Sequence, residues 1–446
     1  MLTGLMNVVR SPDLRKKVLF TLGILAIFRV GSTLPVPNVN VGRLNECLTA
    51  AQAGENASLY SMINMFSGGA LLQLAVFALG IMPYITASII LQIMTVVVPR
   101  LATLKKEGSS GQAKITQYTR YLTLMLAVLN GTGIIMMAIN GQLLGSCDNI
   151  VYDKGLFSIV LMILVMTAGT GMVMWLGELI TERGVGNGMS VLIFTQILAR
   201  FPSQMWSIKT SNDHGSGDRG FFLFFLVLAI GLLVMAAILF MEQGQRRIPV
   251  QYAKRMVGRK MYGGSKTYIP LKVNQSGVIP VIFASSLLYL PRLYTIMRPQ
   301  NPDRDDWGDK LASFISNNFL RGDGWTYNLL YSLLIIAFCY FYISITFNPE
   351  EMADNMKKYG GFIPGIRAGL PTQRYIAYVL SRLTAPGSLY LALVALIPTL
   401  AIAYLNADQQ FPFGGTSILI VVGVGLDTVK QIQSQLEQRS YEGFLS

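Results

Sequence analysis

The chain has 446 residues, of which 52% are hydrophobic and 13% are charged. Soluble proteins carry about a quarter charged residues, so this composition excludes a large soluble helical core and favours lipid as the solvent. Lysine and arginine, 36 in number, outnumber the 23 acidic residues. The three cysteines, Cys47, Cys147 and Cys339, are scattered without a C-x-x-C pair. They imply neither a disulfide framework nor a metal site.

Apolar stretches recur along the chain, and roughly 20 apolar residues form a helix that crosses a hydrocarbon core. The clearest stretch, 221–241, has no charged or hydrogen-bonding side chain. Arg29 and Arg382 interrupt two stretches, and the fifth and tenth stretches are short. A count of nine or eleven spans is therefore an alternative to the ten predicted here. The ten predicted spans are 18–36, 74–98, 118–139, 156–177, 188–201, 221–241, 277–293, 327–347, 375–400 and 416–429.

Basic residues give the orientation, because lysine and arginine concentrate on the cytoplasmic side of bacterial inner-membrane proteins. Their distribution over the loops places both termini in the cytoplasm. Residues 1–17 contain Arg10, Arg15, Lys16 and Lys17 and lack a cleavable signal pattern, so the chain is expected to insert without processing.

Span parity predicts two halves of five spans in opposite orientations, with a pore between them. No similarity of residues between the halves supports this arrangement. The predicted units are a cytoplasmic N-terminus (1–17), an N-terminal half (18–202), an external hinge loop (203–220), a C-terminal half (221–429) and a cytoplasmic tail (430–446).

A short amphipathic helix precedes the second span. Leu59, Met62, Ile63 and Phe66 have the i, i+3, i+4, i+7 spacing of one helix face, and Gly68-Gly69 breaks the helix. Such a helix is too short to cross hydrocarbon, and at membrane depth it is tolerated only inside protein or beside a wet cavity. It is either a movable stopper or a helix lying on the membrane surface.

Two long cytoplasmic loops, 242–274 and 348–374, are basic. In the first, Ile248, Val250 and Tyr252 alternate as in a strand, and Gly263-Gly264 offers a turn, which together predict an exposed hairpin. The charge suits an acidic protein surface or nucleic-acid phosphates. Ordinary topology charge is the alternative.

The sequence contains no set of residues that is typical of an enzyme active site. There is no phosphate loop of the G-x-x-x-x-G-K-[ST] type and a single histidine, His214. The glycines of 184–188 are better explained by close helix packing than by nucleotide binding. Ion-coupled transporters bury carboxylates at mid-span, whereas Glu178 and Asp427 lie at the ends of spans. Transport of a small solute is therefore the second hypothesis.

Helix-weakening residues recur in three predicted spans, at Gly80 and Pro83, at Pro280 and Pro291, and at Pro386-Gly387. Such spans can bend or separate. Polar side chains on the second, third and seventh spans form either a seam between separable helices or routine interhelical hydrogen bonds. These side chains are Thr86, Ser88, Gln92, Asn130, Ser285 and Ser286.

Ordered motifs along almost the whole chain closely resemble the bacterial SecY family, the central subunit of the Sec translocon. They are Phe28-Arg-Val-Gly31, Asn64-Met-Phe-Ser-Gly-Gly-Ala-Leu71, Ala78-Leu-Gly-Ile-Met-Pro-Tyr-Ile85, Thr181-Glu-Arg-Gly-Val-Gly-Asn-Gly188, Gly244-Gln-Arg-Arg247, Tyr252-Ala-Lys-Arg255, Pro270-Leu-Lys-Val-Asn274, Gly277-Val-Ile-Pro280, Phe283-Ala-Ser-Ser286 and Gly361-Phe-Ile-Pro-Gly-Ile-Arg367.

The resemblance implies an all-α polytopic membrane protein with ten transmembrane helices, in two inverted pseudo-symmetric halves around an hourglass pore. A lateral gate would open between the second and third spans on one side and the seventh and eighth on the other. The stopper becomes the plug of the family, about 58–72, including Ser67, Gly68 and Gly69. The constriction ring would be Ile81, Ile85, Met189, Ile193, Ile282 and Ile420, with Met189 replacing the usual isoleucine.

The resemblance also implies the function, a channel without ATPase activity or cofactor that passes unfolded secretory polypeptides through the bacterial plasma membrane. By the same resemblance, it would also release membrane-protein segments laterally into the lipid. Implied partners are the small subunits SecE and SecG, the SecA motor, the ribosome, signal peptides and preproteins. Docking would use Arg246, Arg247, Arg255, Arg259 and Arg367, the last at a family position important for motor-driven transport.

Overall fold

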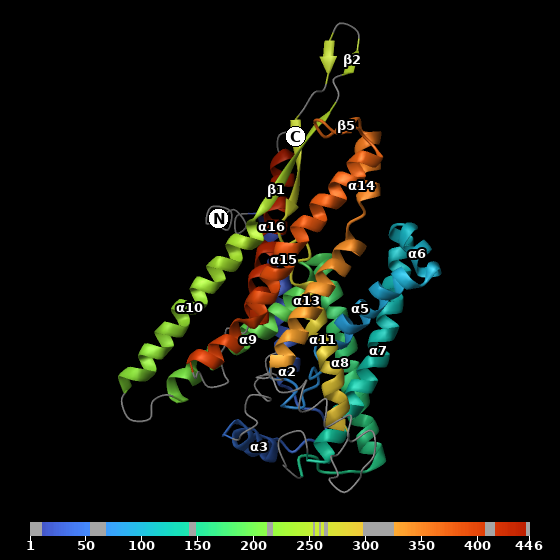
Figure 1. Ribbon diagram of the computed structural model, residues 1–446. Coiled ribbons are helices and arrows are strands. Elements are labelled where there is room, and N and C mark those ends of the chain that lie inside the picture. Colours follow the sequence, from blue (N-terminus) through green and yellow to red (C-terminus); the bar gives the residue numbers. More distant parts are fainter. Residues whose placement is uncertain are drawn as a thin grey trace.

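The computed structural model describes residues 11–53, 68–141, 149–211, 217–252, 255–257, 260–262, 266–297, 325–405 and 415–442. Long helices lie side by side as a bundle, and a narrow hairpin projects from one end (Figure 1). The short helix α3, Val41–Ala53, lies at the opposite end.

A helix lies in each of the ten predicted span ranges, and most of these helices are longer than predicted. They are α2 (Pro12–Thr33), α5 (Met82–Val97), α7 (Ser109–Ile139), α8 (Leu156–Arg183), α9 (Gly188–Ser211), α10 (Gly217–Gln243), α11 (Ile279–Met297), α13 (Trp325–Thr346), α15 (Leu370–Leu405) and α16 (Gly415–Glu442).

Not all of these helices are spans by length and composition alone. Within the described ranges, five stretches are long and apolar enough to cross a membrane: α7, α8, α10 from Phe224, α13 together with its continuation to Lys358, and the first part of α15. A sixth counts if α5 and α6 (Pro99–Lys106), which meet at a bend of 99°, are taken as one broken span. The chain is therefore a helical membrane protein with several spans.

The second predicted span begins eight residues too early, because residues 74–81 are not helical. The helix α5 starts at Met82, with Pro83 in its first turn, where proline is tolerated. Before it, Leu74 and Gly80 have left-handed backbone angles, with φ of 45° and 54°. Val36 N donates to Leu74 O, and Val76 N donates to Leu34 O. Hydropathy alone could not reveal that this apolar segment pairs with residues 34–36, which follow α2.

The predicted hairpin is confirmed. The strand β1 (Gln245–Tyr252) pairs with β4 (Lys266–Lys272) in antiparallel register, with Ile248 opposite Ile269. Its extension is formed by β2 (Arg255–Val257) and β3 (Lys260–Tyr262). In this extension Val257 lies opposite Lys260. The turn predicted at Gly263-Gly264 lies outside the described residues.

The second basic loop joins this sheet. Its helix α14 (Pro349–Lys358) is capped by Asn348, whose side chain accepts a hydrogen bond from Glu350 N. The short strand β5 (Gly361–Phe362) then pairs with the end of β1. The two basic loops, far apart in sequence, thus form one structural unit over a core that includes Ile248, Leu271 and Ile363.

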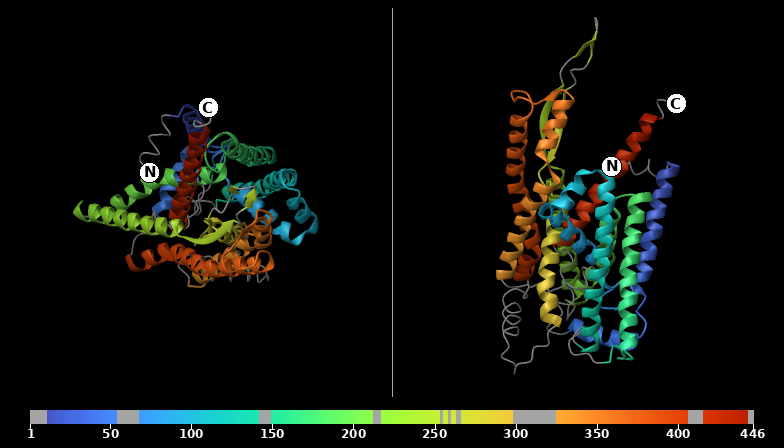
Figure 2. Two further views of the ribbon diagram at one scale, coloured as in Figure 1. Left: turned by 90° about the horizontal axis from the view of Figure 1, so that it is seen from above. Right: turned by 90° about the vertical axis from the view of Figure 1, so that its right-hand side faces the viewer.

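Hydrophobic packing divides the bundle into two groups of helices. The first group contains α2, α7, α8, α9 and the start of α5, packed around two cores that share α8 and include Met166 and Leu192. The second group contains α10, α11, α13, α15 and α16, packed around a core that includes Ile335 and Leu391. Figure 2 shows α2 starting and α16 ending toward the end of the molecule that carries the hairpin.

The core that contains Met166 also includes Cys47 on α3. Cys47 is disulfide-bonded, which corrects the expectation from the sequence. The scattered positions of three cysteines gave no spacing from which such a bond could be predicted.

Candidate pore

A small apolar cavity lies where the two groups of helices meet. It is lined from the first group by Ile81, Met82 and Ile85 of α5 and its start and by Ile193, Gln196 and Ile197 of α9, and from the second by Ile282 and Ser285 of α11 and Ile420 of α16. Five of the six predicted ring residues therefore border one space. Its volume is about 20 Å³, room for about one water molecule. Nothing the size of a polypeptide can pass at this point.

The sixth predicted ring residue, Met189, packs beside this space instead of lining it. It belongs to the same apolar cluster as Ile81, Ile85 and Ile193. Its sulfur lies where a side chain on Gly177 of α8 would be, since an added Cβ would come within 2.5 Å of Met189 Sδ. The flexible methionine side chain thus fills the space between α8 and α9.

A polar residue that the sequence analysis missed borders the same cavity. Gln196 is buried, with 4% of its surface exposed, and its Nε2 has no hydrogen-bond partner among the described residues. A Cβ on Gly80 would lie 2.6 Å from this nitrogen, so glycine is needed there both for space and for its positive φ. Gln196 places an unused hydrogen-bond donor beside the isoleucines.

Next to Gln196, two arginines hold the backbone that leaves the predicted plug. Arg200 Nε donates to Gly68 O at 2.9 Å, and Arg29 Nη1 donates to the same oxygen at 3.3 Å. Gly69 has φ of 89°, and a Cβ there would overlap the Arg200 guanidinium. Arg29 is therefore not directed at lipid. We call Gly68, Arg29 and Arg200 the plug anchor.

Of the predicted plug range 58–72, the structure describes residues 68–72, which include Gly68 and Gly69. Leu59, Met62, Ile63, Phe66 and Ser67 lie outside the described residues. The sequence could have indicated Arg200, because a charged residue near the end of an apolar span needs a partner.

The predicted gate residues lie on three helices in mutual contact, since α11 touches both α5 and α7. Their hydrogen bonds run along the helices: Thr86 Oγ1 donates to Met82 O, and Ser285 Oγ donates to Ile282 O. Ser286 Oγ is buried without a partner among the described residues. Ser88, Gln92 and Asn130 are partly buried. In this state, the hydrogen bonds of Thr86 and Ser285 do not cross from helix to helix.

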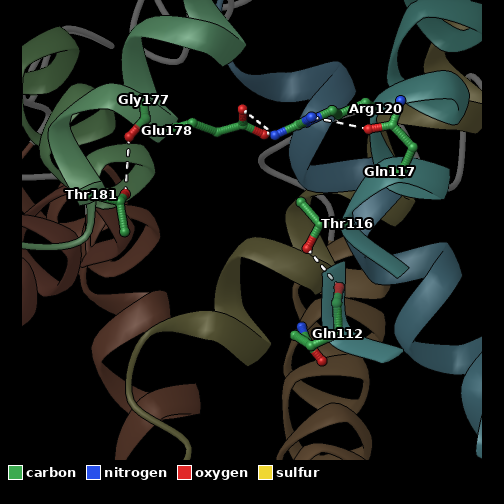
Figure 3. A network of polar contacts seen from close by, with 7 residues as sticks. All are labelled: Gln112, Thr116, Gln117, Arg120, Gly177, Glu178 and Thr181. Atoms are coloured by element: carbon green, nitrogen blue, oxygen red, sulfur yellow. Dashed lines mark hydrogen bonds and ion pairs between the residues drawn. The ribbon is translucent and has the colours of Figure 1, made fainter. Parts of the chain in front are cut away.

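A different polar contact fastens α7 to α8 (Figure 3). Arg120 binds Glu178 with both nitrogens of one edge, Nε to Oε1 at 2.9 Å and Nη2 to Oε2 at 2.8 Å. Arg120 Nη1 also donates to Gln117 Oε1. Bidentate pairs of this kind are strong and fix geometry. The helices α7 and α8 are thereby joined, whereas no hydrogen bond links α11 to α5 or α7 among the described side chains.

The predicted docking arginines lie on the sheet unit. Arg246 and Arg247 are exposed on β1, and Arg247 stacks over the Tyr268 ring at 4.8 Å. Arg367 is exposed after β5. Arg255 begins β2, and Arg259 lies outside the described residues. Arg382, whose partner the sequence did not indicate, is exposed and stacks over Tyr378 at 5.4 Å.

At the opposite end of the bundle, Asp153 closes a loop before α8. Its carboxylate accepts hydrogen bonds from Ser158 Oγ and from Gly155 N. The Ser158 hydroxyl, followed by the Gly155 amide, lowers the pKa of Asp153 from its ordinary value. Over the part of the chain that the structure describes, no three His, Cys, Asp or Glu side chains gather that could hold a metal ion.

These helices and the apolar constriction between their two groups define a multi-pass membrane protein of the channel class. The SecY family model matches residues 75–429, and the chain belongs to this family. It is 59% identical over 448 residues to protein translocase subunit SecY of Streptomyces scabiei, covering 100% of both chains.

Solved structures of low identity share the fold. A protein-conducting channel superimposes with a TM-score of 0.62 at 15% identity, over 94% of this chain and 91% of that one. Sec61 in the canine ribosome-channel complex from the endoplasmic reticulum superimposes with a TM-score of 0.57 at 16% identity, over the same shares of 94% and 91%.

Proposed function

We propose that this chain is the channel subunit of a bacterial protein translocase, which passes unfolded polypeptides across the plasma membrane and releases apolar segments into lipid. One observation carries the proposal. Isoleucines from α5, α9, α11 and α16, separated by up to 339 positions between Ile81 and Ile420, converge on a space of about 20 Å³.

An apolar constriction of this kind suits an unfolded substrate. A narrow oily passage blocks hydrated ions by excluding water, without a charged group that would bind part of the substrate. Dispersion contacts between side chains are non-directional, so the ring can widen around an extended chain of any sequence. No single residue of the ring binds the substrate polypeptide, as transport requires.

Opening would involve two further parts. The plug anchor has to release Gly68 so that the plug segment can move, and α11 has to separate from α5 and α7. A hydrophobic substrate segment then partitions sideways into lipid, while polar segments continue through. Ten spans in two inverted halves, 18–202 and 221–429, with both termini cytoplasmic, form the proposed frame.

Energy would come from a docked partner. The basic sheet unit offers Arg246, Arg247 and Arg367 to an acidic protein surface or to phosphates. SecA as the motor and the ribosome are the proposed partners, with SecE and SecG as small subunits. The Sec61 relative, solved in a ribosome-channel complex, supports the ribosome.

Crosslinking of an arrested substrate tests the channel directly. A photoreactive amino acid replaces Ile282, and a secretory preprotein is stalled during transport in inverted membrane vesicles. The expected result is a crosslink to the stalled chain. The same probe at Leu233 of α10, which is 70% exposed, is the control for side chains facing lipid. Equal labelling from both positions, or none from Ile282, contradicts the proposal.

Docking is tested by reversing one charge. Arg367→Glu is expected to abolish SecA-driven transport of the preprotein, because the new carboxylate repels an acidic partner. Lys154→Glu makes the same change on the exposed loop before α8 and is expected to transport normally. Near-normal transport by Arg367→Glu removes the assigned role of this arginine.

A further inference from the structure

A buried polar joint connects the basic sheet unit to the gate helix α11. The chain passes from β4, which ends at Lys272, to α11, which begins at Ile279, through residues 273–278. Asn274 and Ser276 in this connection are buried, with 3% and 4% of their surfaces exposed. They face Glu242, at the end of α10, which is 7% exposed. Buried polar groups are costly without partners, so their contacts define the conformation of this segment.

Asn274 occupies the centre of the joint. Its Nδ2 donates both to Glu242 Oε1 and to Gly277 O, the latter at 3.1 Å. Its Oδ1 accepts from Ser276 Oγ at 3.1 Å. Gly277 has φ of 61°, which glycine adopts without strain. One side chain therefore sets the turn into α11 and attaches that turn to α10.

The backbone around the joint is confined on two further sides. A Cβ on Gly387 of α15 would lie 2.6 Å from Val273 O, and one on Gly423 of α16 would lie 2.6 Å from Val278 Cγ2. Lys272 Nζ lies 3.5 Å from Asp427 Oδ1 of α16. The connection is packed between α15 and α16 and is not a loosely packed loop. Because residues 273–278 are closely packed, a displacement of β4 is expected to displace the start of α11 as well.

The two ends of this connection carry different tasks. On one side, β4 pairs with β1, which pairs with β5 just before Arg367, so both basic loops move with it. On the other side, α11 carries Ile282 and Ser285, which line the constriction cavity. The joint thus lies in the short chain segment that connects the docking surface directly to the ring.

We infer that Asn274 is a positioning residue that transmits displacement of the docked basic loops to α11 through its bonds to Glu242 and Gly277. The inference rests on the proposed function, because it assumes that docking drives opening. When a partner moves the sheet, the joint moves the start of α11 relative to α5 and α7. Without the joint, docking and opening become independent events.

Substitutions at Asn274 and Glu242 distinguish this role from a general loss of stability. Asn274→Asp places a second carboxylate against Glu242 and removes the donor to Gly277. Preprotein transport by SecA in inverted vesicles is expected to fall about tenfold, the order expected when buried groups lose their partners. Binding of SecA to the same vesicles is expected to stay within about twofold, since exposed arginines of the sheet unit are unchanged.

The double variant Glu242→Gln with Asn274→Asp restores a donor–acceptor pair with the two groups exchanged. Transport is expected to recover several-fold over Asn274→Asp alone, but not fully, because the bond to Gly277 remains lost. Asn140→Ala, at an exposed asparagine that follows α7, is the matched control and is expected to behave as wild type.

Three results overturn the inference. They are wild-type transport by Asn274→Asp, no recovery in the double variant, or loss of SecA binding in proportion to transport. Failure of both the wild type and the Asn140→Ala control to transport the preprotein is a distinct result, which overturns the proposed function and the inference with it.

Discussion

The constriction ring and the plug anchor lie next to each other and are built on opposite principles. The ring closes with isoleucines around a space of about 20 Å³, whereas the anchor holds one carbonyl, Gly68 O, with the two guanidinium groups of Arg29 and Arg200. Apolar contacts weaken gradually as side chains separate, but a hydrogen bond is lost within a small displacement. The difference suggests that the ring supplies an elastic seal and the anchor a switch with two states.

Gln196 belongs to both regions. Its side chain borders the cavity, its Cβ and backbone lie 3.3 Å from where a side chain on Gly68 would begin, and its Nε2 is without a partner among the described residues. Gln196 thus connects the apolar lining of the ring to the glycine that the anchor holds. The following changes test the division between seal and switch, from the largest effect to the smallest.

Deleting residues 59–69 removes the plug and the anchor acceptor, Gly68 O, together. Loss of two charge-assisted hydrogen bonds costs about 3 kcal/mol of closed-state stability, or about 100-fold in the closed-to-open ratio. Ion leak in planar bilayers is expected to rise by that order. Unchanged conductance would show that the ring alone holds the seal and that residues 59–69 are no plug.

Arg200→Met removes one anchoring bond and keeps an unbranched chain of similar reach. The expected loss is about 1.5 kcal/mol, which raises ion leak about tenfold. Arg183→Met, an exposed arginine in the last turn of α8, is the matched control and is expected to leave conductance unchanged. If both variants leak equally, the bond from Arg200 to Gly68 does not hold the closed state.

Ile193→Val trims one methylene group from the ring. Such a change costs roughly 0.5 to 1.5 kcal/mol in a tight core, and we expect the lower end because Ile193 is only partly buried and borders a cavity. Ion leak is expected to rise about twofold. A leak above that of Arg200→Met would reverse the comparison and make the ring the stricter of the two regions.

Asp153 is an exposed polar group, in contrast to the partly buried arginines of the plug anchor. Because Ser158 and Gly155 lower its pKa, it stabilises the folded protein above the ordinary pKa of aspartate, about 3.9. That contribution is lost as pH falls through the lower pKa of the folded state. Melting of wild type and Asp153→Asn, compared from neutral to acidic pH, is expected to show a small difference that disappears under acid. A difference that grows under acid contradicts this assignment.

Local patterns predicted the elements of this protein well. The ten apolar ranges each contain a helix, and the alternation of Ile248, Val250 and Tyr252 marks a strand. The two pairs of ring residues on α5 and α9 are visible as i, i+4 positions, but composition gives no reason to choose them over other core residues. The family resemblance supplied that choice and added Ile282 and Ile420.

Boundaries and partners were predicted less well, for a common reason. The non-helical segment before α5 is held by backbone hydrogen bonds between residues 74–76 and residues 34–36, which are far apart in the chain. Arg29 and Arg200 share a carbonyl that is 132 positions from Arg200. No periodicity within a window of ten or twenty residues contains these contacts.

The sequence by itself determined that this chain lies in a membrane and roughly which residues form its helices. It also determined that a basic hairpin projects from the bundle. Hydropathy and alternation, which carry these conclusions, are local properties. Only the tertiary structure decided that isoleucines of four helices meet, that Gly68 is held by two arginines and that Asn274 joins α10 to α11. Those contacts depend on how whole helices pack, so their partners are distant in sequence and are fixed by geometry.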